Sequence, residues 1–230
     1  MKSRYVVALL GALALAAAPS AAQQPAEGKF RITRACLEAL CAARNPYGLI
    51  TRGPLVLRDL DVLQESSRRA KVGVSVSIPT LDERVWKTTE PGTSPPAARM
   101  RAVKALVSAG VRATVAMAPI LPGLSDRPEL LADVVRGARE AGACGIWVGV
   151  VNLREGTREH FFEVLAREWP EELPRYEAMF GARAYPAKAV TRPIEERVAA
   201  LKHEHGVADR RALRWTPPED AVQMEIPGWR

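Results

Sequence analysis

The stretch VRATVAMAPILPGLSD, residues 111–126, decides how this chain folds. Its apolar run, Val111, Ala113 and residues 115–118, is short and nearly unbroken, which is typical of a strand buried on both faces in a parallel sheet. A Pro-Gly loop, residues 119–123, ends the run. In parallel α/β folds ligands bind at the C-terminal ends of the strands, because the strand-to-helix loops gather there. We therefore expect any binding site near residues 119–126.

Strand and helix patterns alternate on both sides of this stretch. Strands are expected at residues 47–51, 71–78 and 144–153, and helices at residues 33–44, 57–69, 97–109 and 129–141. Such alternation predicts right-handed βαβ crossovers and a parallel sheet. No G-x-G-x-x-G motif follows any of these strands. The pattern therefore favours a barrel or partial barrel over a doubly wound sheet.

Two segments near the expected strand ends extend this outline. The connection 79–96 is unusually long, and long ordered loops in compact domains are usually functional, so it is a second place for a site. After a helix expected at residues 157–169, the chain becomes rich in Pro, Arg and aromatic residues, with one more amphipathic helix at residues 193–205. We divide the chain into a signal-like segment (1–22), a partial βα barrel (23–170) and a helical or irregular extension (171–230).

Composition permits one folded domain with an extension. The 230 residues are 47% hydrophobic and 26% charged, with a net charge of +7. This charge allows anionic partners, including nucleic acid. The cations are interspersed with 26 acidic residues, and no aromatic residues for base stacking interleave with Arg136, Arg139, Arg154 and Arg158, so support for nucleic-acid binding is weak.

The three cysteines do not form a recognisable disulfide or metal pattern. Cys36, Cys41 and Cys144 are an odd number without paired spacing. On a helix, Cys36 and Cys41 would point about 140° apart, since each residue turns the helix by about 100°. We interpret all three as small hydrophobic residues, and we expect no metal site.

Residues 1–22 have the order of a secretory signal peptide. Lys2 and Arg4 precede an apolar run, residues 5–18, and small residues at Ser20 and Ala22 follow it. The run is too short for a stable transmembrane span. Two interpretations remain open: a protein exported after cleavage before Gln23, or an artefactual start on a cytoplasmic chain. We favour the cytoplasmic one, because the segment stands where a buried strand would be needed.

Four segments together resemble the radical S-adenosylmethionine (SAM) superfamily, in the branch related to spore photoproduct lyase. They are QPAEGKFRITRACLEAL (24–40), ITRGPLVLRDLDVL (50–63), VSVSIPTLDERVWKTTEPGTSPPAARMRAVKALVSAGV (74–111) and VAMAPILPGLSD (115–126). The resemblance spans about residues 24–185. It implies a six-stranded partial (β/α) barrel whose first two strands are missing, and a family chemistry that uses SAM and a 4Fe–4S cluster.

The sequence departs from this family at the cluster. The superfamily holds its cluster with a C-x-x-x-C-x-x-C loop, and that spacing occurs nowhere in the chain. Three thiolates must converge on one cubane, and the three cysteines are expected on a helix and a later strand. We therefore expect a radical SAM core fragment that does not catalyse radical chemistry as it stands.

The resemblance also implies residues for the cofactor cradle. Polar contacts to the ribose or carboxylate region fall to Ser75 and Ser77, and Arg99 resembles the cation that pairs with the cofactor carboxylate. The adenine would lie against the loop from Pro119 to Gly123 and the strand around Trp147 and Val148. The competing hypothesis is a secreted α/β protein that binds a small anionic ligand. In either case an open strand edge at residues 47–51 would favour self-association.

Overall fold

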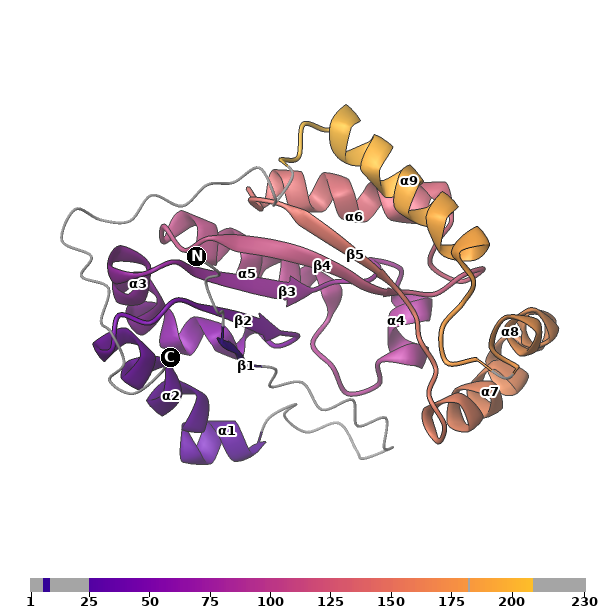
Figure 1. Ribbon diagram of the computed structural model, residues 1–230, viewed down its shortest axis with the longest axis horizontal. Helices are drawn as coiled ribbons and strands as arrows, with labels where there is room; N and C mark the ends of the chain where they lie inside the picture. Colours follow the sequence, from indigo (N-terminus) through magenta and orange to yellow (C-terminus); the bar gives the residue numbers. More distant parts are fainter. Residues whose placement is uncertain (1–5, 9–24, 182, 209–230) are drawn as a thin grey trace, which may run out of the picture.

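The computed structural model describes residues 6–8, 25–181 and 183–208 of the chain (Figure 1). Within these residues the chain forms a five-stranded, all-parallel sheet whose strands lie in sequence order. The strands are β1 (Val6–Ala8), β2 (Tyr47–Thr51), β3 (Val72–Ser77), β4 (Ala113–Ile120) and β5 (Ile146–Val150). The predicted α/β architecture with a parallel sheet is confirmed.

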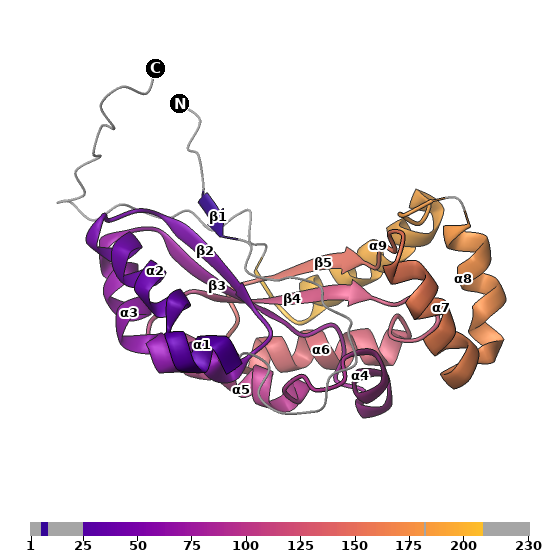
Figure 2. The same ribbon diagram turned by 90° about the horizontal axis from the view of Figure 1, so that it is seen from below.

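Helices cover one face of this sheet. Figures 1 and 2 show α3, α5 and α6 running along it, and α9 contacts both α6 and β5. The bounds are α1 (Pro25–Phe30), α2 (Ile32–Ala42), a 3-10 helix η1 (Pro54–Asp59), α3 (Leu60–Arg69), α5 (Pro96–Ser108), α6 (Pro128–Glu140) and α9 (Lys188–Glu204).

The two faces of the sheet differ in side-chain size. Alternate residues of a strand point to opposite faces, so Val74, Val76 and Met117 pack against the helices in the main hydrophobic core. On the other face, Ser75 lies opposite Thr114, and their hydroxyl oxygens are 2.7 Å apart. The apolar layer under the helices therefore anchors the sheet, and the other face carries small residues at Ser75 and Thr114.

A second, smaller hydrophobic core lies at the C-terminal ends of β4 and β5. It is built by α4 (Glu83–Thr89), α7 (Thr157–Glu168), the 3-10 helix η2 (Pro170–Glu172) and α8 (Leu173–Phe180). Its centre is an aromatic group, in which the Tyr176 ring lies 5.4 Å from Phe161 and 5.8 Å from Phe180. Figure 2 shows α7 and α8 set apart from the sheet at this end.

Four α-helices differ from the sequence prediction, and the first is α1, which precedes the earliest helix predicted. The connection 79–96 contains α4, whose first turn is capped where Val85 N donates to Asp82 Oδ1 at 2.8 Å. The extension predicted to be helical or irregular contains α8, a helix that no pattern located, and α9 begins at Lys188, five residues before Pro193. The prediction placed the start of this helix at Pro193, because proline is common in the first turn of a helix. In the structure Pro193 lies in the second turn, where it removes one backbone hydrogen bond and the helix continues.

The edge of β2 is more covered than predicted. The strand Val6–Ala8 pairs with Tyr47–Leu49, so the expectation of an edge open along all of residues 47–51 is wrong. Ile50 and Thr51 pair with β3 alone within the described residues. The predicted four strands are β2 to β5, and β1 lies beside them. Among the residues that the structure describes, no helix is long and apolar enough to span a bilayer.

Candidate functional site

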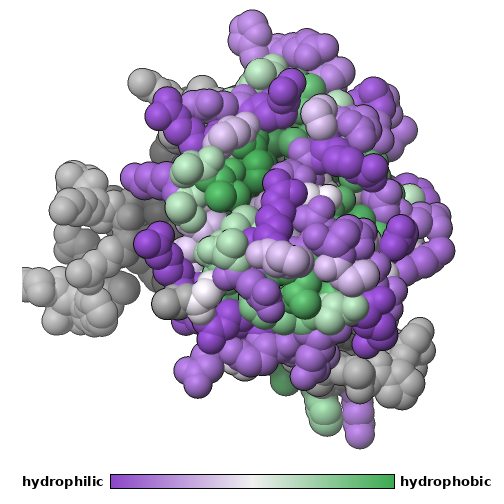
Figure 3. Space-filling view, turned by 90° about the vertical axis from the view of Figure 1, so that its right-hand side faces the viewer, coloured by the Kyte–Doolittle hydropathy of each residue, from purple (hydrophilic) through white to green (hydrophobic). Residues whose placement is uncertain are grey.

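A cavity of about 330 Å³ lies at the C-terminal ends of β3, β4 and β5, where the strand-to-helix loops meet. Figure 3 looks onto this end of the molecule, where hydrophobic residues show in hollows between polar side chains. The residues around the cavity are Arg52, Pro79, Thr80, Val85, Thr89, Glu90, Ala118, Pro119, Leu121, Ser125, Trp147, Gly149, Val150, Val151, Asn152, Leu153, Thr157 and Phe161. The loop after β4 thus contributes to the cavity, as its sequence predicted.

Most of the cavity wall is apolar. Leu121, Val151 and Phe161 belong to the second core, so the cavity borders that core. Gly149 allows the Trp147 indole to lie against the strand, because a Cβ at Gly149 would be 3.2 Å from Trp147 Cζ3 and 3.1 Å from the Ala118 Cβ. This wall suits a flat, largely apolar group.

Two oppositely charged residues line the same cavity. Arg52 directly follows β2, and Glu90 follows the last turn of α4. Arg52 Nη1 lies 3.6 Å from Glu90 Oε1, which is too long for a hydrogen bond. Glu90 is 8% exposed, whereas the Arg52 side chain is 34% exposed. The cavity therefore has a polar end with a partly exposed cation.

Arg99, on α5, is fully buried behind Glu90 and does not line the cavity. Its Nη2 donates to Glu90 Oε2 at 2.6 Å and to Thr93 Oγ1 at 2.6 Å. Its Nη1 donates to Ser77 O at 3.0 Å, and its Nε donates to Ser94 O at 2.8 Å. Burial lowers the pKa of Arg99, and the charge of Glu90 opposes that shift. Arg99 thus joins the end of β3 to the loop before α5, instead of facing a ligand as the resemblance implied.

The other predicted site residues are divided between the cavity and its surroundings. Pro119 and Trp147 line it. Ser75 and Ser77 lie behind it: Ser75 pairs with Thr114, and Ser77 Oγ donates to Ala118 O at 2.9 Å. Val148 packs against the main core.

Gly123, in the loop after β4, contacts side chains of η2 and α8 instead of the cavity. It has a φ of 86°, and an added Cβ would overlap Glu172 Oε2 and lie 2.7 Å from Arg175 Nη1. A glycine here permits both the left-handed backbone and the close approach of the Glu172 and Arg175 side chains.

Sequence reasoning missed Arg52 and Glu90. Glu90 lies in the long connection that was marked as a second place for a site, and Arg52 is the first residue after a predicted strand. Arg52 therefore carried a usable signal, because residues just beyond the C-terminal end of a parallel strand face the site. No sequence pattern indicated that Arg52 and Glu90 lie side by side, since they are 38 positions apart in the chain.

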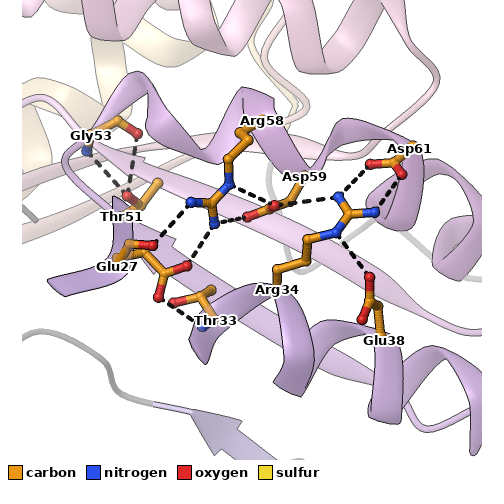
Figure 4. Close-up of polar contacts among 9 residues, drawn as sticks. All are labelled: Glu27, Thr33, Arg34, Glu38, Thr51, Gly53, Arg58, Asp59 and Asp61. Atoms are coloured by element: carbon orange, nitrogen blue, oxygen red, sulfur yellow. Dashed lines mark hydrogen bonds and ion pairs between the residues drawn. The ribbon is translucent and has the colours of Figure 1, made fainter. Parts of the chain in front are cut away.

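A polar network joins the helices that precede and follow the segment with Arg52 (Figure 4). It links α1 and α2 to η1 and α3 through Glu27, Thr33, Arg34, Glu38, Arg58, Asp59 and Asp61. Arg58 Nη2 donates to Glu27 Oε1 at 2.6 Å, and Arg34 Nη2 donates to Asp61 Oδ2 at 2.7 Å. Hydrogen bonds from Arg34 lower the pKa of Asp61 to about 2. Burial raises the pKa of Glu27, but hydrogen bonds from Thr33 and Arg58 outweigh it, and the net shift is downward.

Comparisons with solved structures identify the fold. A variant spore photoproduct lyase with bound AdoMet and dinucleoside spore photoproduct superimposes with a TM-score of 0.56, at 15% identity, over 78% of this chain and 54% of that one. Streptococcus suis SuiB bound to its precursor peptide SuiA gives a TM-score of 0.51, at 12% identity, over 79% of this chain and 34% of that one. This chain has the radical SAM fold. The predicted partial radical SAM barrel is thereby confirmed.

Sequence relatives are longer than this radical SAM-type chain. No family model matches it. An uncharacterized protein of Mycobacterium tuberculosis is 34% identical over 201 residues, which are 87% of this chain and 58% of that protein. An uncharacterized protein of Methanocaldococcus jannaschii is 30% identical over 107 residues, which are 46% of this chain and 40% of that protein. The chain thus spans little more than half of the mycobacterial relative.

The cysteines of this chain do not fit the iron-sulfur cluster that the resemblance implied. Cys36 is exposed and Cys41 is buried on the same helix, α2, whereas Cys144 lies in the loop before β5, at the other end of the strands from the cavity. The described part of the chain holds no group of three or more His, Cys, Asp or Glu side chains placed to bind a metal ion. We derive no chemical step through a cluster from these residues.

Proposed function

We propose that the cavity at the strand ends binds an S-adenosyl ligand, SAM or a product of it, and that the residues of this chain alone do not catalyse radical chemistry. The carrying observation is the cavity itself, which combines a flat apolar wall with a charged end at the strand ends of a radical SAM fold. AdoMet in the structural neighbour with that fold supports the ligand class.

The two halves of the cavity suit the two halves of such a ligand. A purine ring can lie between Pro119 and Trp147, where the wall is apolar and Gly149 keeps the strand surface flat. The guanidinium of Arg52 can bind a carboxylate, and it is the cation at this cavity that remains partly exposed. Arg52 therefore takes the role that the resemblance assigned to Arg99.

The test is a titration of the purified chain with S-adenosylhomocysteine, in which calorimetry measures the heat of binding. Gly149→Val should abolish binding, because the new methyl groups displace the Trp147 ring toward the cavity. Gly48→Val is the matched control: Gly48 is also a strand glycine, and a Cβ there meets no atom within 4 Å. Circular dichroism verifies that both variants fold. Absence of binding by the wild-type chain, or equal binding by both variants, would contradict the proposal.

A second candidate function is a secreted protein that binds a small anion, and Arg52 at the cavity mouth is the observation that favours it. The two functions differ in compartment as well as in ligand, and we propose the cytoplasmic one. Expression of the reading frame with a C-terminal tag, followed by N-terminal sequencing of the purified chain, distinguishes them. A mature chain that begins at Gln23 outside the cytoplasm would favour the secreted protein.

A further inference from the structure

A groove of about 470 Å³ lies among the helices that cover the sheet, between α4, α5 and α6. Figure 2 shows these three helices together below the sheet. The groove is separate from the cavity at the strand ends, because α4 lies between the two: Trp86 lines the groove, whereas Val85 and Thr89 line the cavity. A partner in the groove therefore leaves the cavity free.

The floor of the groove is apolar and preformed. Leu81 and Met100 pack on the main core, and Gly137 brings the α6 backbone close to both: a Cβ at Gly137 would lie 3.1 Å from Met100 Cε. The Trp86 ring is fixed at one end of the groove, where its Nε1 donates to Thr93 Oγ1 at 2.8 Å. Leu81, Trp86 and Met100 are partly exposed, and such an apolar surface marks a site of protein contact.

Three charged side chains at the rim of the groove are free to meet a partner. Arg101 and Lys104 stand on the α5 side, Glu140 stands on the α6 side, and all three are exposed. No described residue forms an ion pair or a hydrogen bond with any of these side chains. On α4, by contrast, Lys87 pairs with Glu83 at 2.7 Å. An acidic flank on a partner would meet two unpaired cations on α5.

We propose that this groove binds an amphipathic helix of a partner protein, with an apolar stripe against Trp86 and Met100 and acidic residues against Arg101 and Lys104. The lining residues of α5 begin at Pro96 and end at Lys104, a span of about 12 Å, which is about two turns of a helix. That span holds apolar anchors at i, i+3 or i+4 and i+7.

Glu140 restricts the charge of the other flank of the partner helix. It faces the groove from α6, opposite the two cations, so acidic residues on both flanks would meet repulsion there. The partner helix therefore has one acidic flank and one neutral or basic flank. This inference does not depend on which ligand the cavity at the strand ends binds.

Three labelled helical peptides with the same stripe of Leu measure the recognition. The first has Glu on one flank and Lys on the other, the second has Lys on both flanks, and the third has Gln on both. Fluorescence polarisation measures the affinity of the full chain for each peptide. Two exposed ion pairs together contribute about 2-fold to 30-fold, so the first peptide should bind more tightly than the third by that factor. The second should bind most weakly, because its Lys residues meet Arg101 and Lys104.

Variants of the full chain separate charge from shape. Arg101→Glu with Lys104→Glu should make the peptide with Lys on both flanks bind best. Gly137→Phe fills the groove beside Met100 and should weaken all three peptides about 10-fold or more, because less Leu surface is buried. Arg139 is exposed and points about 200° away from Gly137 around α6, so Arg139→Glu and Arg139→Phe are the matched controls and should leave binding unchanged. Circular dichroism verifies that each variant folds.

Several results would refute the proposal. They are no binding of the first peptide to the folded wild-type chain, equal affinity for all three peptides, and equal binding by Gly137→Phe and the wild type. Other occupants give distinct results. A dimer that Gly137→Phe converts to a monomer indicates a second copy of the chain, and displacement of the peptide by a single-stranded oligonucleotide indicates a polyanion site. Tighter peptide binding after Glu219→Gln, Asp220→Gln and Glu225→Gln indicates competition by the chain itself. Each of these three results would show that a partner helix is the wrong occupant.

Discussion

Replacing Arg99 with methionine tests how strongly this buried arginine holds the cavity wall. The methionine keeps the aliphatic volume of the side chain but removes all of its donors. Glu90 then loses its 2.6 Å partner, and the carbonyl oxygens of Ser77 and Ser94 lose theirs. Removal of one partner of a buried ion pair costs about 3–5 kcal/mol in the free energy of unfolding. For a chain of this length each kcal/mol lowers the melting temperature by about 2–4 °C, so the expected fall is about 6–20 °C.

Urea denaturation of three variants measures the contribution of the charge. Addition of Glu90→Gln to Arg99→Met removes the uncompensated carboxylate, so the double variant should be more stable than the sum of the single losses by about 0.5–3 kcal/mol. The carbonyls of Ser77 and Ser94 stay unpaired, so recovery should be incomplete. Arg101→Met changes an exposed arginine on the same helix and should alter stability by less than about 0.5 kcal/mol. An Arg99→Met variant as stable as this control would refute the reasoning.

Three further results are expected. Gly123→Ala and Gly92→Ala should each cost about 1–2 kcal/mol in urea melts, because both glycines have positive φ and the atoms that an added Cβ meets at Gly123 end the flexible Glu172 and Arg175 side chains; a much larger loss at Gly123 would contradict this. Anaerobic reconstitution with iron and sulfide should yield no stoichiometric cluster, and one cluster per chain that disappears when the three cysteines are replaced would overturn that expectation. The pKa of Glu27 is below its usual 4.5 in the folded chain, so its contribution to stability is present above that value and is lost as the pH falls through the lower folded pKa. Stability of Glu27→Gln should therefore depend less on pH in that acidic range, and an unchanged acid profile would exclude the effect.

The sequence by itself determined the sheet and most of its helices. Strand β2 has the predicted bounds, and β3, β4 and β5 differ by a few residues at their ends, because their apolar runs are short and bounded by Gly or Pro. The loop after β4 was located as part of the site for the same reason, since a parallel strand presents its C-terminal loop at the ligand end of the fold. The resemblance added Pro119 and Trp147, and both residues line the cavity.

Only the tertiary structure decided which charges meet at the cavity. Arg52 follows β2, Glu90 follows α4 and Arg99 lies on α5, whereas periodicity describes the faces of one element at a time. The resemblance implied that Arg99 pairs with a cofactor carboxylate, but Arg99 is fully buried with fixed acceptors, and the partly exposed cation at the cavity is Arg52. The short helices α4 and α8 were missed for a related reason: they are held by capping and by packing in the second core, which contribute more to helices of this length than local propensity does.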